Sequence, residues 1–326
     1  CDTQPFAPPP RVFEKVEHPP KVVIAGAGPA GLFCALRLID HGIAPIILER
    51  GKAVEEREQD VKKFCETGML DPDSNVQFGE GGAGAFSDGK LNTQTNDARN
   101  RDVLDTFVRF GAPEEVGYLG KPHVGSDNLK KVVANIRAHI LRSGGEFRFC
   151  ERLTDVRLYG GRLEAVITTR GEIACDALVL AVGHSARDTF EMLLARGFVM
   201  EQKEFAVGVR IEHLQSAIGR AQYGAGYAAL PAADYKLVSH ASDRAVFTFC
   251  MCPGGVVIPS ASEPGGVVTN GMSNYARSER NANSALVVQV RRCRRTVPEK
   301  TRTCCFFDRR RKLSRARTAG GGFPCR

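Results

Sequence analysis

The apolar positions of the chain fall into short runs separated by glycine and by amphipathic stretches. A β-branched run at 21–25 is followed by a glycine-rich turn, an apolar stretch at 29–41 and a second apolar run at 44–49. Pro29 suits the first turn of a helix, where its missing N–H costs nothing, and Gly42 suits the C-terminal cap. This order predicts a strand–helix–strand unit with parallel strands.

The pattern changes further along the chain. Residues 127–142 carry apolar side chains at helical spacing, and several strand-like runs follow up to residue 183, with Gly160–Gly161 as a hairpin turn. From about residue 200 the apolar and polar positions alternate, as in 205–213, which indicates antiparallel strands. The sequence therefore predicts an α/β nucleotide-binding domain with an inserted β-rich domain.

We divide the chain by these changes in pattern. Six prolines mark residues 1–20 as an extended lead-in. The expected units are a nucleotide-binding domain at 21–199, a β-rich substrate domain at 200–275, the start of a return to the nucleotide domain at 276–290, and a basic tail at 291–326.

The strongest motif is a glycine triad in the first turn. Gly26, Gly28 and Gly31 have the G-x-G-x-x-G spacing of dinucleotide-binding turns, with Pro29 and Ala30 inside it. Gly26 permits the tight turn, Gly28 lets a pyrophosphate approach the helix N-terminus, and Gly31 lets the helix lie close to the strand. Glu49, 18 residues past Gly31, ends the second strand and suits the ribose hydroxyls. This arrangement predicts dinucleotide binding, without distinguishing FAD from NAD.

Several segments together resemble a known family. "VVIAGAGPAGLFCALRLIDHGIAPIILERG" looks like the start of flavoproteins with two dinucleotide-binding domains. "NVQFGEGGAGAFSDGKLNTQTND", "VGHSARDTFEMLL", "FAVGVRIEH", "LPAADYKL" and "TFCMCPGG" resemble the bacterial FAD-dependent dehydrogenases, or NAD(P)/FAD-dependent oxidoreductases, over about residues 21–290. The resemblance implies a Rossmann-like, three-layer FAD-binding domain of the glutathione-reductase type, FAD as cofactor and NAD(P)H as a candidate electron donor.

The resemblance also implies a role for the glycine-rich segment at 79–91. There the backbone would approach the ribityl chain and the flavin ring, so side chains are few. Ser87 would hydrogen-bond a ring or ribityl oxygen, and Lys90 would place positive charge near the N1/O2 edge. The alternative is an ordinary mobile loop. The implied contacts of this loop are Gly81, Gly82, Ala83, Gly84, Ser87 and Lys90.

Other positions follow from the same resemblance. Arg50 and Gly51 would flank the adenosine, and the backbone of Leu153 would meet the adenine. Gly183 ends a strand on the nucleotide side. His184 follows it, and would either contact the cofactor or begin a turn without touching it.

Candidates for catalysis are weak, because hydride chemistry belongs to the flavin. Lys90 and His184 are two of them. Arg210 would bind an anionic substrate group or lie on a solvated face. Cys250 and Cys252 would be buried thiols, since an i, i+2 disulfide is poorly placed in an extended strand, or one of them would be a thiol near the flavin. Neither Cys-x-x-Cys pairs nor His/Cys clusters at zinc spacing occur, so we expect no metal site.

The basic charge is concentrated at the end of the chain. The net charge is +8 overall and +11 in residues 291–326, which leaves −3 elsewhere. We interpret that tail as aberrant sequence from a frame shift or assembly error, with weak flavin retention as a consequence; a basic arm for RNA is the alternative. Nucleic acid is therefore not an expected partner of the remaining chain.

These observations favour an FAD-dependent oxidoreductase that acts on a small molecule or a redox partner. We expect a cytoplasmic protein, since scattered cysteines accompany no export signal and no apolar run long enough to span a membrane. One alternative is a flavin-containing protein that modifies or binds RNA. The other is a non-catalytic flavin-binding fragment, in which case this form of the chain is inactive.

Overall fold

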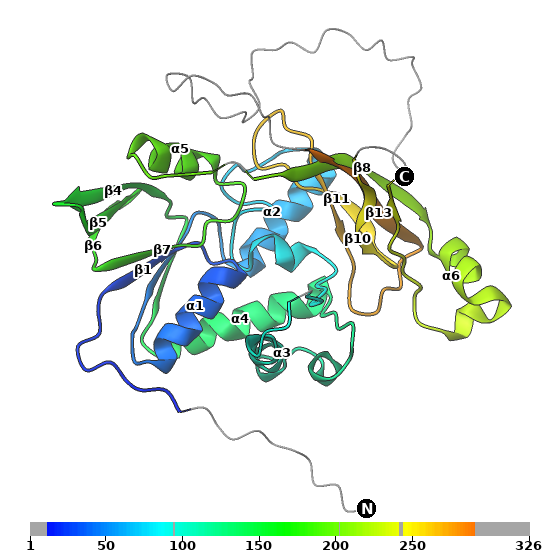
Figure 1. The fold of residues 1–326 in the computed structure, drawn as a ribbon, viewed down its shortest axis with the longest axis horizontal. Coiled ribbons are helices and arrows are strands. Elements are labelled where there is room, and N and C mark those ends of the chain that lie inside the picture. The colour runs from blue at the N-terminus through cyan, green and yellow to red at the C-terminus, as the bar shows by residue number, and fades with distance from the viewer. Residues whose placement is uncertain (1–11, 94, 202, 241–243, 291–326) are drawn as a thin grey trace, which may run out of the picture.

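The computed structural model describes residues 12–93, 95–201, 203–240 and 244–290 (Figure 1). At its centre is a four-stranded sheet in the order β3-β2-β1-β7, with every neighbouring pair parallel. Parallel neighbours need a crossover connection, which helix α1 supplies between β1 and β2. The elements are β1 Val22–Ala25, α1 Pro29–Asp40, β2 Ile46–Glu49, β3 Glu146–Phe149 and β7 Ala177–Leu180.

The central sheet is covered on both faces. Val22 and Ile24 of β1 pack in one apolar cluster with residues of α1 and α4, whereas Val23 and Ala25 pack in a second cluster with β4 and β5. Alternate side chains of a strand point to opposite faces, so one strand serves both layers. The covering elements are α4 Ser126–Arg142, β4 Leu153–Tyr159, β5 Arg162–Thr168 and β6 Gly171–Ala174. Three layers result, as the predicted fold class requires.

Three further helices surround this unit. Helix α2 and helix α3 lie along segments for which the apolar pattern gave no expectation, and α5 follows β7 (Figure 1). Two short 3₁₀ turns, η1 and η2, lie between them. Their bounds are α2 Val54–Thr67, η1 Gly82–Phe86, α3 Arg99–Arg109, η2 Glu114–Gly117 and α5 Arg187–Ala195.

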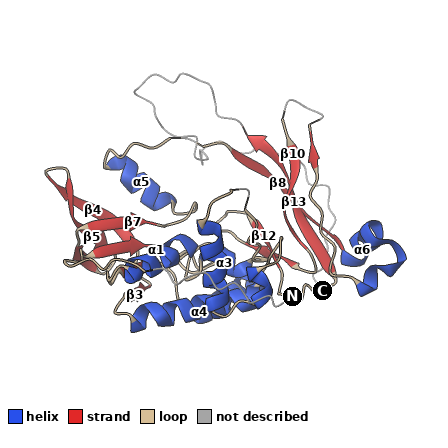
Figure 2. Cartoon of the chain, turned by 60° about the horizontal axis from the view of Figure 1, so that its bottom comes forward, coloured by secondary structure: helices blue, strands red, loops and turns tan. Residues whose placement is uncertain are grey.

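The β-rich unit contains an antiparallel sheet in the order β8-β13-β10-β9. It stands beside the helical layer, with α6 at its far end (Figure 2). A separate hairpin joins β11 to β12. The elements are β8 Phe205–Leu214, α6 Gln215–Tyr223, η3 Gly224–Ala229, β9 Val238–Ser239, β10 Val246–Cys252, β11 Val256–Pro259, β12 Thr269–Met272 and β13 Asn281–Val290.

Strand β13 changes one expected boundary. Residues 276–290 were expected to begin the return to the nucleotide domain. Instead, Asn281–Val290 pairs with β8 on one side and β10 on the other. Ten residues of continuous pairing with β8 make β13 an interior strand of the β-rich sheet. The expectations for residues 1–11 and 291–326 lie outside the described residues.

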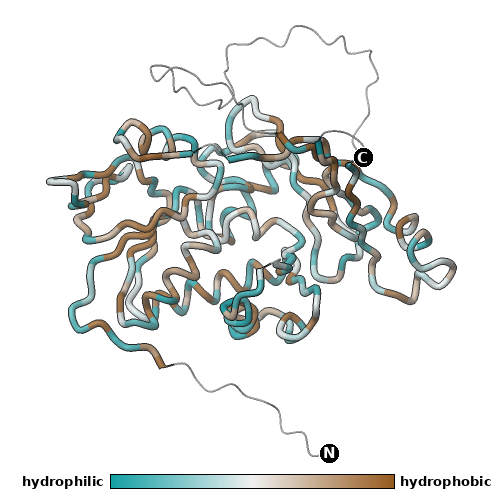
Figure 3. Tube along the Cα trace, in the orientation of Figure 1, coloured by the Kyte–Doolittle hydropathy of each residue, from teal (hydrophilic) through white to brown (hydrophobic). Residues whose placement is uncertain are grey.

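Apolar residues gather on the strands of the central sheet (Figure 3). Strand β8 differs, because its apolar positions are largely exposed: Phe205 is 56% and Val209 is 65% exposed. The alternation of apolar and polar residues along β8 therefore identifies the two faces of the strand, but the apolar face is not buried. Within the described ranges, no helix has the length and apolarity that crossing a membrane requires.

Candidate functional site

The turn between β1 and α1 shows which glycines the fold itself requires. Gly26 has φ +111°, and an added Cβ would lie 2.3 Å from the Ala181 carbonyl oxygen. A Cβ on Gly31 would lie 1.9 Å from the carbonyl oxygen of Gly26. A Cβ on Gly28, by contrast, would be 3.8 Å from the Gly82 Cα, an ordinary contact. The space in front of the helix N-terminus is thus open at Gly28.

The second glycine-rich segment touches this turn. The Gly81 amide donates to the Ala27 carbonyl at 2.8 Å. A Cβ on Gly82, whose φ is +59°, would lie 3.3 Å from the Gly28 Cα. Two bends that are more than fifty residues apart in sequence therefore meet with little side-chain material between them.

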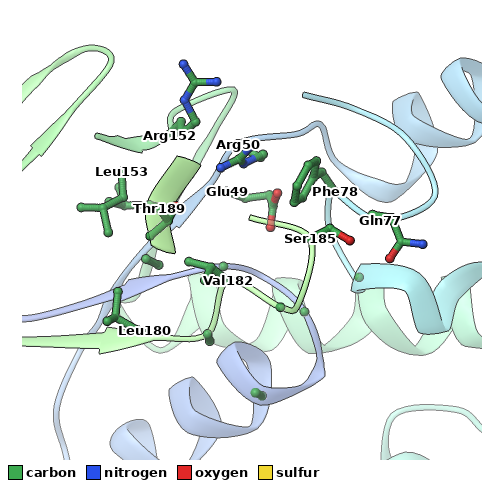
Figure 4. A pocket seen from close by; sticks show the side chains of 18 of the residues that line it. Glu49, Arg50, Gln77, Phe78, Arg152, Leu153, Leu180, Val182, Ser185 and Thr189 are labelled. Atoms are coloured by element: carbon green, nitrogen blue, oxygen red, sulfur yellow. The ribbon is translucent and has the colours of Figure 1, made fainter. Parts of the chain in front are cut away.

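Both bends line one cavity of about 470 Å³ (Figure 4). That volume lies in the range of small-molecule and cofactor sites. The ends of β1, β2 and β7, the start of β4 and part of α5 complete the lining. The predicted contacts that line it are Gly26, Gly28, Pro29, Ala30, Glu49, Arg50, Gly82, Ala83, Leu153, Gly183 and His184.

The N-terminus of α1 offers an anion site at this cavity. The first amides of any helix lack intrahelical acceptors, and the positive end of the helix dipole adds to their field. Gly28 occupies the N-cap, and no described side chain caps the helix. Pro29 and Ala30 follow it in the cavity lining. These residues fit a pyrophosphate, because the open position at Gly28 lets it reach the amides.

Glu49 lies at the cavity, but its carboxylate also organises the backbone. One oxygen accepts from the Ala27 amide at 2.8 Å, and the other accepts from Gly51 at 2.9 Å and Gly79 at 3.0 Å. The residue is 5% exposed. A carboxylate has about four acceptor positions, so about one remains for a ribose hydroxyl. Glu49 therefore joins the two glycine-rich segments as well as facing the ligand space.

Arg50 lies over one wall of the cavity. Its guanidinium is 4.1 Å from the centre of the Phe78 ring and donates to the Asp188 carboxylate at 2.7 Å. Asp188 belongs to the first turn of α5, and Arg152 lies 3.6 Å from it. The ion pairs hold the pKa of Asp188 below its usual range against the effect of burial. This network ties α5 to the segment after β2.

Some lining residues had no place in the sequence expectations. Gln77, Phe78 and Thr189 are three of them. Figure 4 shows Gln77 and Phe78 on the opposite side of the cavity from Leu153. The Thr189 hydroxyl is buried and has no hydrogen-bond partner within the described part of the chain. Their only sequence signal is that they lie in segments carrying the family resemblance.

The structure also shows how the loop between η1 and α2 is held. Arg57 is fully buried, and its guanidinium donates to the carbonyls of Asn75, Val76 and Glu80 at 2.6–2.9 Å. Burial lowers the pKa of Arg57 to about 10, so it stays charged at neutral pH. Its side chain would be only 2.3 Å from a Cβ on Gly79. Arg57 therefore shapes the segment that carries Gln77 and Phe78.

Some predicted contacts lie away from the cavity lining. Gly31 and Gly51 support the backbone; a Cβ on Gly51 would lie 2.7 Å from the Gly79 Cα. The Ser87 hydroxyl donates to the Gly84 carbonyl at 2.8 Å and accepts from the Gly89 amide at 3.0 Å. Its hydroxyl is thus engaged within the turn, and its hydrogen bond to a flavin oxygen stays a prediction. The remaining predicted contacts outside the lining are Gly81, Gly84 and Lys90.

The candidates for catalysis divide into two places. His184 lines the cavity and is 2.9 Å from the Ser185 hydroxyl through its Nδ1. Lys90, Arg210, Cys250 and Cys252 instead meet one another at β10. Arg210 is partly buried there and hydrogen-bonds the Cys250 carbonyl, so it does not lie on a solvated face.

Comparison with known proteins finds a matching family model and a related sequence. Residues 204–322 match the family described as FAD-dependent protein, C-terminal domain-like. An uncharacterised protein of Clostridium beijerinckii is 53% identical over 272 residues, which cover 82% of this chain and 51% of the relative. The chain thus spans about half the length of the curated relative that it matches.

Solved structures that match part of this chain include THI4 of Thermovibrio ammonificans, at 17% identity and a TM-score of 0.36, covering 55% of this chain and 64% of that one. CtdE in complex with FAD has 15% identity and a TM-score of 0.34, covering 86% and 61%. FqzB has 12% identity and a TM-score of 0.41, covering 85% and 56%. The match at residues 204–322 confirms the resemblance to FAD-dependent proteins that was inferred from the sequence.

Proposed function

We propose that this chain binds FAD in the cavity and acts as the flavin-binding and substrate-facing part of an FAD-dependent oxidoreductase. The observation that carries the proposal is the meeting of two glycine-rich bends, at Gly28 and Gly82, beside an uncapped helix N-terminus. An extended dinucleotide needs close backbone approach along its length and a cationic field at its pyrophosphate. Both are available in one cavity.

The residues around the cavity then have separate roles. The first amides of α1 would bind the pyrophosphate. Glu49 would orient the ribose with its remaining acceptor position, and Leu153 would contact the adenine. Arg50 is held over Phe78 by Asp188, and it would close the adenosine end of the cavity against water.

Bound FAD supplies the hydride and electron transfer that protein side chains do not supply. NAD(P)H is the proposed electron donor, and the oxidant is a small molecule or a redox partner. The β-rich unit at 205–290 is the proposed substrate side. The chain's own residues position the cofactor, so the proposal assigns no essential acid or base.

The test separates ligand binding from folding. Gly28→Ala should fold normally, because the new Cβ meets only an ordinary contact and Gly28 has extended backbone angles, φ −75° and ψ −177°. The same methyl group would stand between the pyrophosphate and the helix amides. We expect FAD affinity to fall at least about tenfold, or about 1.4 kcal/mol, as measured by flavin fluorescence titration.

Gly226→Ala is the matched control, because a Cβ at Gly226 meets no described atom within 4 Å. It should bind FAD as the unmodified chain does. NADH and NADPH should each be tested anaerobically for bleaching of the bound flavin at its visible absorbance. An unmodified chain without measurable FAD affinity, or Gly28→Ala with undiminished affinity, would overturn the proposal.

A further inference from the structure

Strand β10 is distorted where it carries its two cysteines. Its pairing register with β13 shifts between Phe249 and Cys252, which marks a β-bulge. Cys250 lies within the bulge at φ +45°, a left-handed conformation that residues other than glycine seldom adopt. The segment is therefore not extended, and the reason for excluding contact between an i, i+2 cysteine pair no longer applies.

The two thiols are close together and differ in exposure. The Cys252 thiol donates a hydrogen bond to the Cys250 carbonyl oxygen at 3.4 Å, so its side chain turns back toward Cys250. Cys252 is fully buried, whereas Cys250 is partly exposed. An incoming reagent would meet Cys250 first, with Cys252 behind it.

Positive charge surrounds the pair. The Lys90 ammonium donates to the Met251 carbonyl, and Arg210 Nη1 lies 3.2 Å from the Cys250 carbonyl oxygen. With the hydrogen bond from Cys252, these two cations lower the pKa of Cys250 to about 6, although burial opposes the shift. The same hydrogen bond and burial raise the pKa of Cys252.

The opposing charge near the pair is partly neutralised. Asp88 forms an ion pair with Lys90 at 2.6 Å, and it would raise the pKa of Cys250. Arg277 also binds Asp88, through two hydrogen bonds of 2.6 and 2.9 Å. Burial lowers the pKa of His123 beside them, which favours its neutral form at neutral pH. The charges facing Cys250 therefore favour its thiolate.

Two unpaired donors lie at the same place. Arg210 Nε and Asn283 Nδ2 are buried without a hydrogen-bond partner among the described residues, and Asn283 is fully buried. A Cβ on Gly271 would lie 2.5 Å from Arg210 Nη1 and 2.7 Å from the Cys252 sulfur. Donors left unpaired in this way favour an incoming acceptor, such as a carboxylate or a developing thiolate.

We propose that Cys250 and Cys252 form a thiol pair that reduces a disulfide substrate. The Cys250 thiolate attacks one substrate sulfur, the substrate S–S bond breaks, and one substrate thiolate leaves. Cys252 then attacks the Cys250 sulfur of the mixed disulfide, and the second substrate thiolate leaves with the proton from Cys252. Two cysteine thiols are oxidised to one disulfide, and one substrate disulfide is reduced to two thiols.

The first test uses the reduced 326-residue chain and oxidised glutathione, with each cysteine followed by peptide mass spectrometry. The unmodified chain should form the Cys250–Cys252 disulfide. Cys252→Ser should retain glutathione on Cys250, because the resolving thiol is absent, and Cys250→Ser should form neither product at this site. Cys65→Ser, a change at an exposed cysteine, should behave like the unmodified chain.

The second test measures the rate of iodoacetamide alkylation against pH, first in the unmodified chain. The rate at Cys250 should have its midpoint near pH 6, whereas an ordinary thiol has its midpoint near about 8.5. Burial and the nearby Glu66 raise the pKa of Cys65, so at pH 6 Cys250 should react at least about tenfold faster than Cys65, after allowing for the lower nucleophilicity of an acidic thiolate. Lys90→Gln should move the midpoint upward, and Lys90→Arg should restore it.

A Cys250 midpoint near about 8.5, or glutathione bound at Cys65 before Cys250, would overturn the proposal. Neither test requires FAD. Failure of the thiol chemistry therefore leaves the proposed FAD site intact, and failure to bind FAD leaves the thiol chemistry to be judged on its own results.

Discussion

The buried Arg57 allows a quantitative prediction about how the cavity is supported. Arg57→Met keeps much of the side-chain volume but removes the guanidinium that binds the carbonyls of Asn75, Val76 and Glu80. It also removes the stacking of the guanidinium on the Phe86 ring, whose centre is 4.8 Å away. Three buried acceptors are then left without their donor.

The expected loss of stability follows from these contacts. Hydrogen bonds to a charged group contribute about 1.5–3 kcal/mol each, but removing the arginine also removes the cost of burying its charge. Breaking one side of a buried charged network costs about 3–5 kcal/mol. We therefore expect Arg57→Met to lower the free energy of unfolding by about 4 kcal/mol, which corresponds to a decrease in melting temperature of roughly 6 °C for a chain of this size.

Circular dichroism melting would measure this change. Arg109→Met is the matched control: Arg109 also stacks on a phenylalanine, at 5.2 Å from the Phe110 ring centre, but it is exposed. An exposed contact of this type contributes about 0.5–1 kcal/mol, so Arg109→Met should melt within about 2 °C of the unmodified chain. Equal melting temperatures for the two variants would refute the assigned role of Arg57.

Three further predictions concern single groups. Thr189→Val should leave the fold unchanged, since the hydroxyl has no described partner, and should weaken FAD binding about threefold to tenfold if the hydroxyl contacts the cofactor; unchanged affinity by fluorescence titration would exclude that contact. Burial raises the pKa of Glu80 from 4.5 to about 7, so the folded state holds its proton more tightly. The stability that Glu80 contributes is complete below pH 4.5 and is lost as pH rises to about 7. The free energy of unfolding of Glu80→Gln should therefore rise by up to about 3 kcal/mol relative to that of the unmodified chain between pH 5 and pH 8. The same difference in unfolding free energy between the two chains at both pH values, measured by urea unfolding, would contradict this. Gly26→Ala should lower stability by at least about 3 kcal/mol, because strain at φ +111° adds to the clash with Ala181; a urea midpoint equal to that of the unmodified chain would show that the turn adapts.

The sequence by itself determined the strand–turn–helix unit and the family resemblance. Gly26 and Gly31 are needed because a Cβ at either position would clash with nearby backbone. The spacing of apolar residues also identified α4 almost to its ends. Local patterns of this kind depend on interactions over a few residues, so they can be read without the fold.

Only the tertiary structure decided which distant segments meet. The assignment of β13 to the β-rich sheet depends on its pairing with β8, about seventy residues earlier. The contact of Gly82 with Gly28, the guanidinium contacts of Arg57 and the cluster around Cys250 also join segments that no sequence period connects. The hydrogen bonds of Ser87 within its turn also depend on the conformation of the loop, which residue type alone does not specify. Long-range pairing and loop conformation are set by the packing of the whole chain, and for that reason they became visible only in the folded structure.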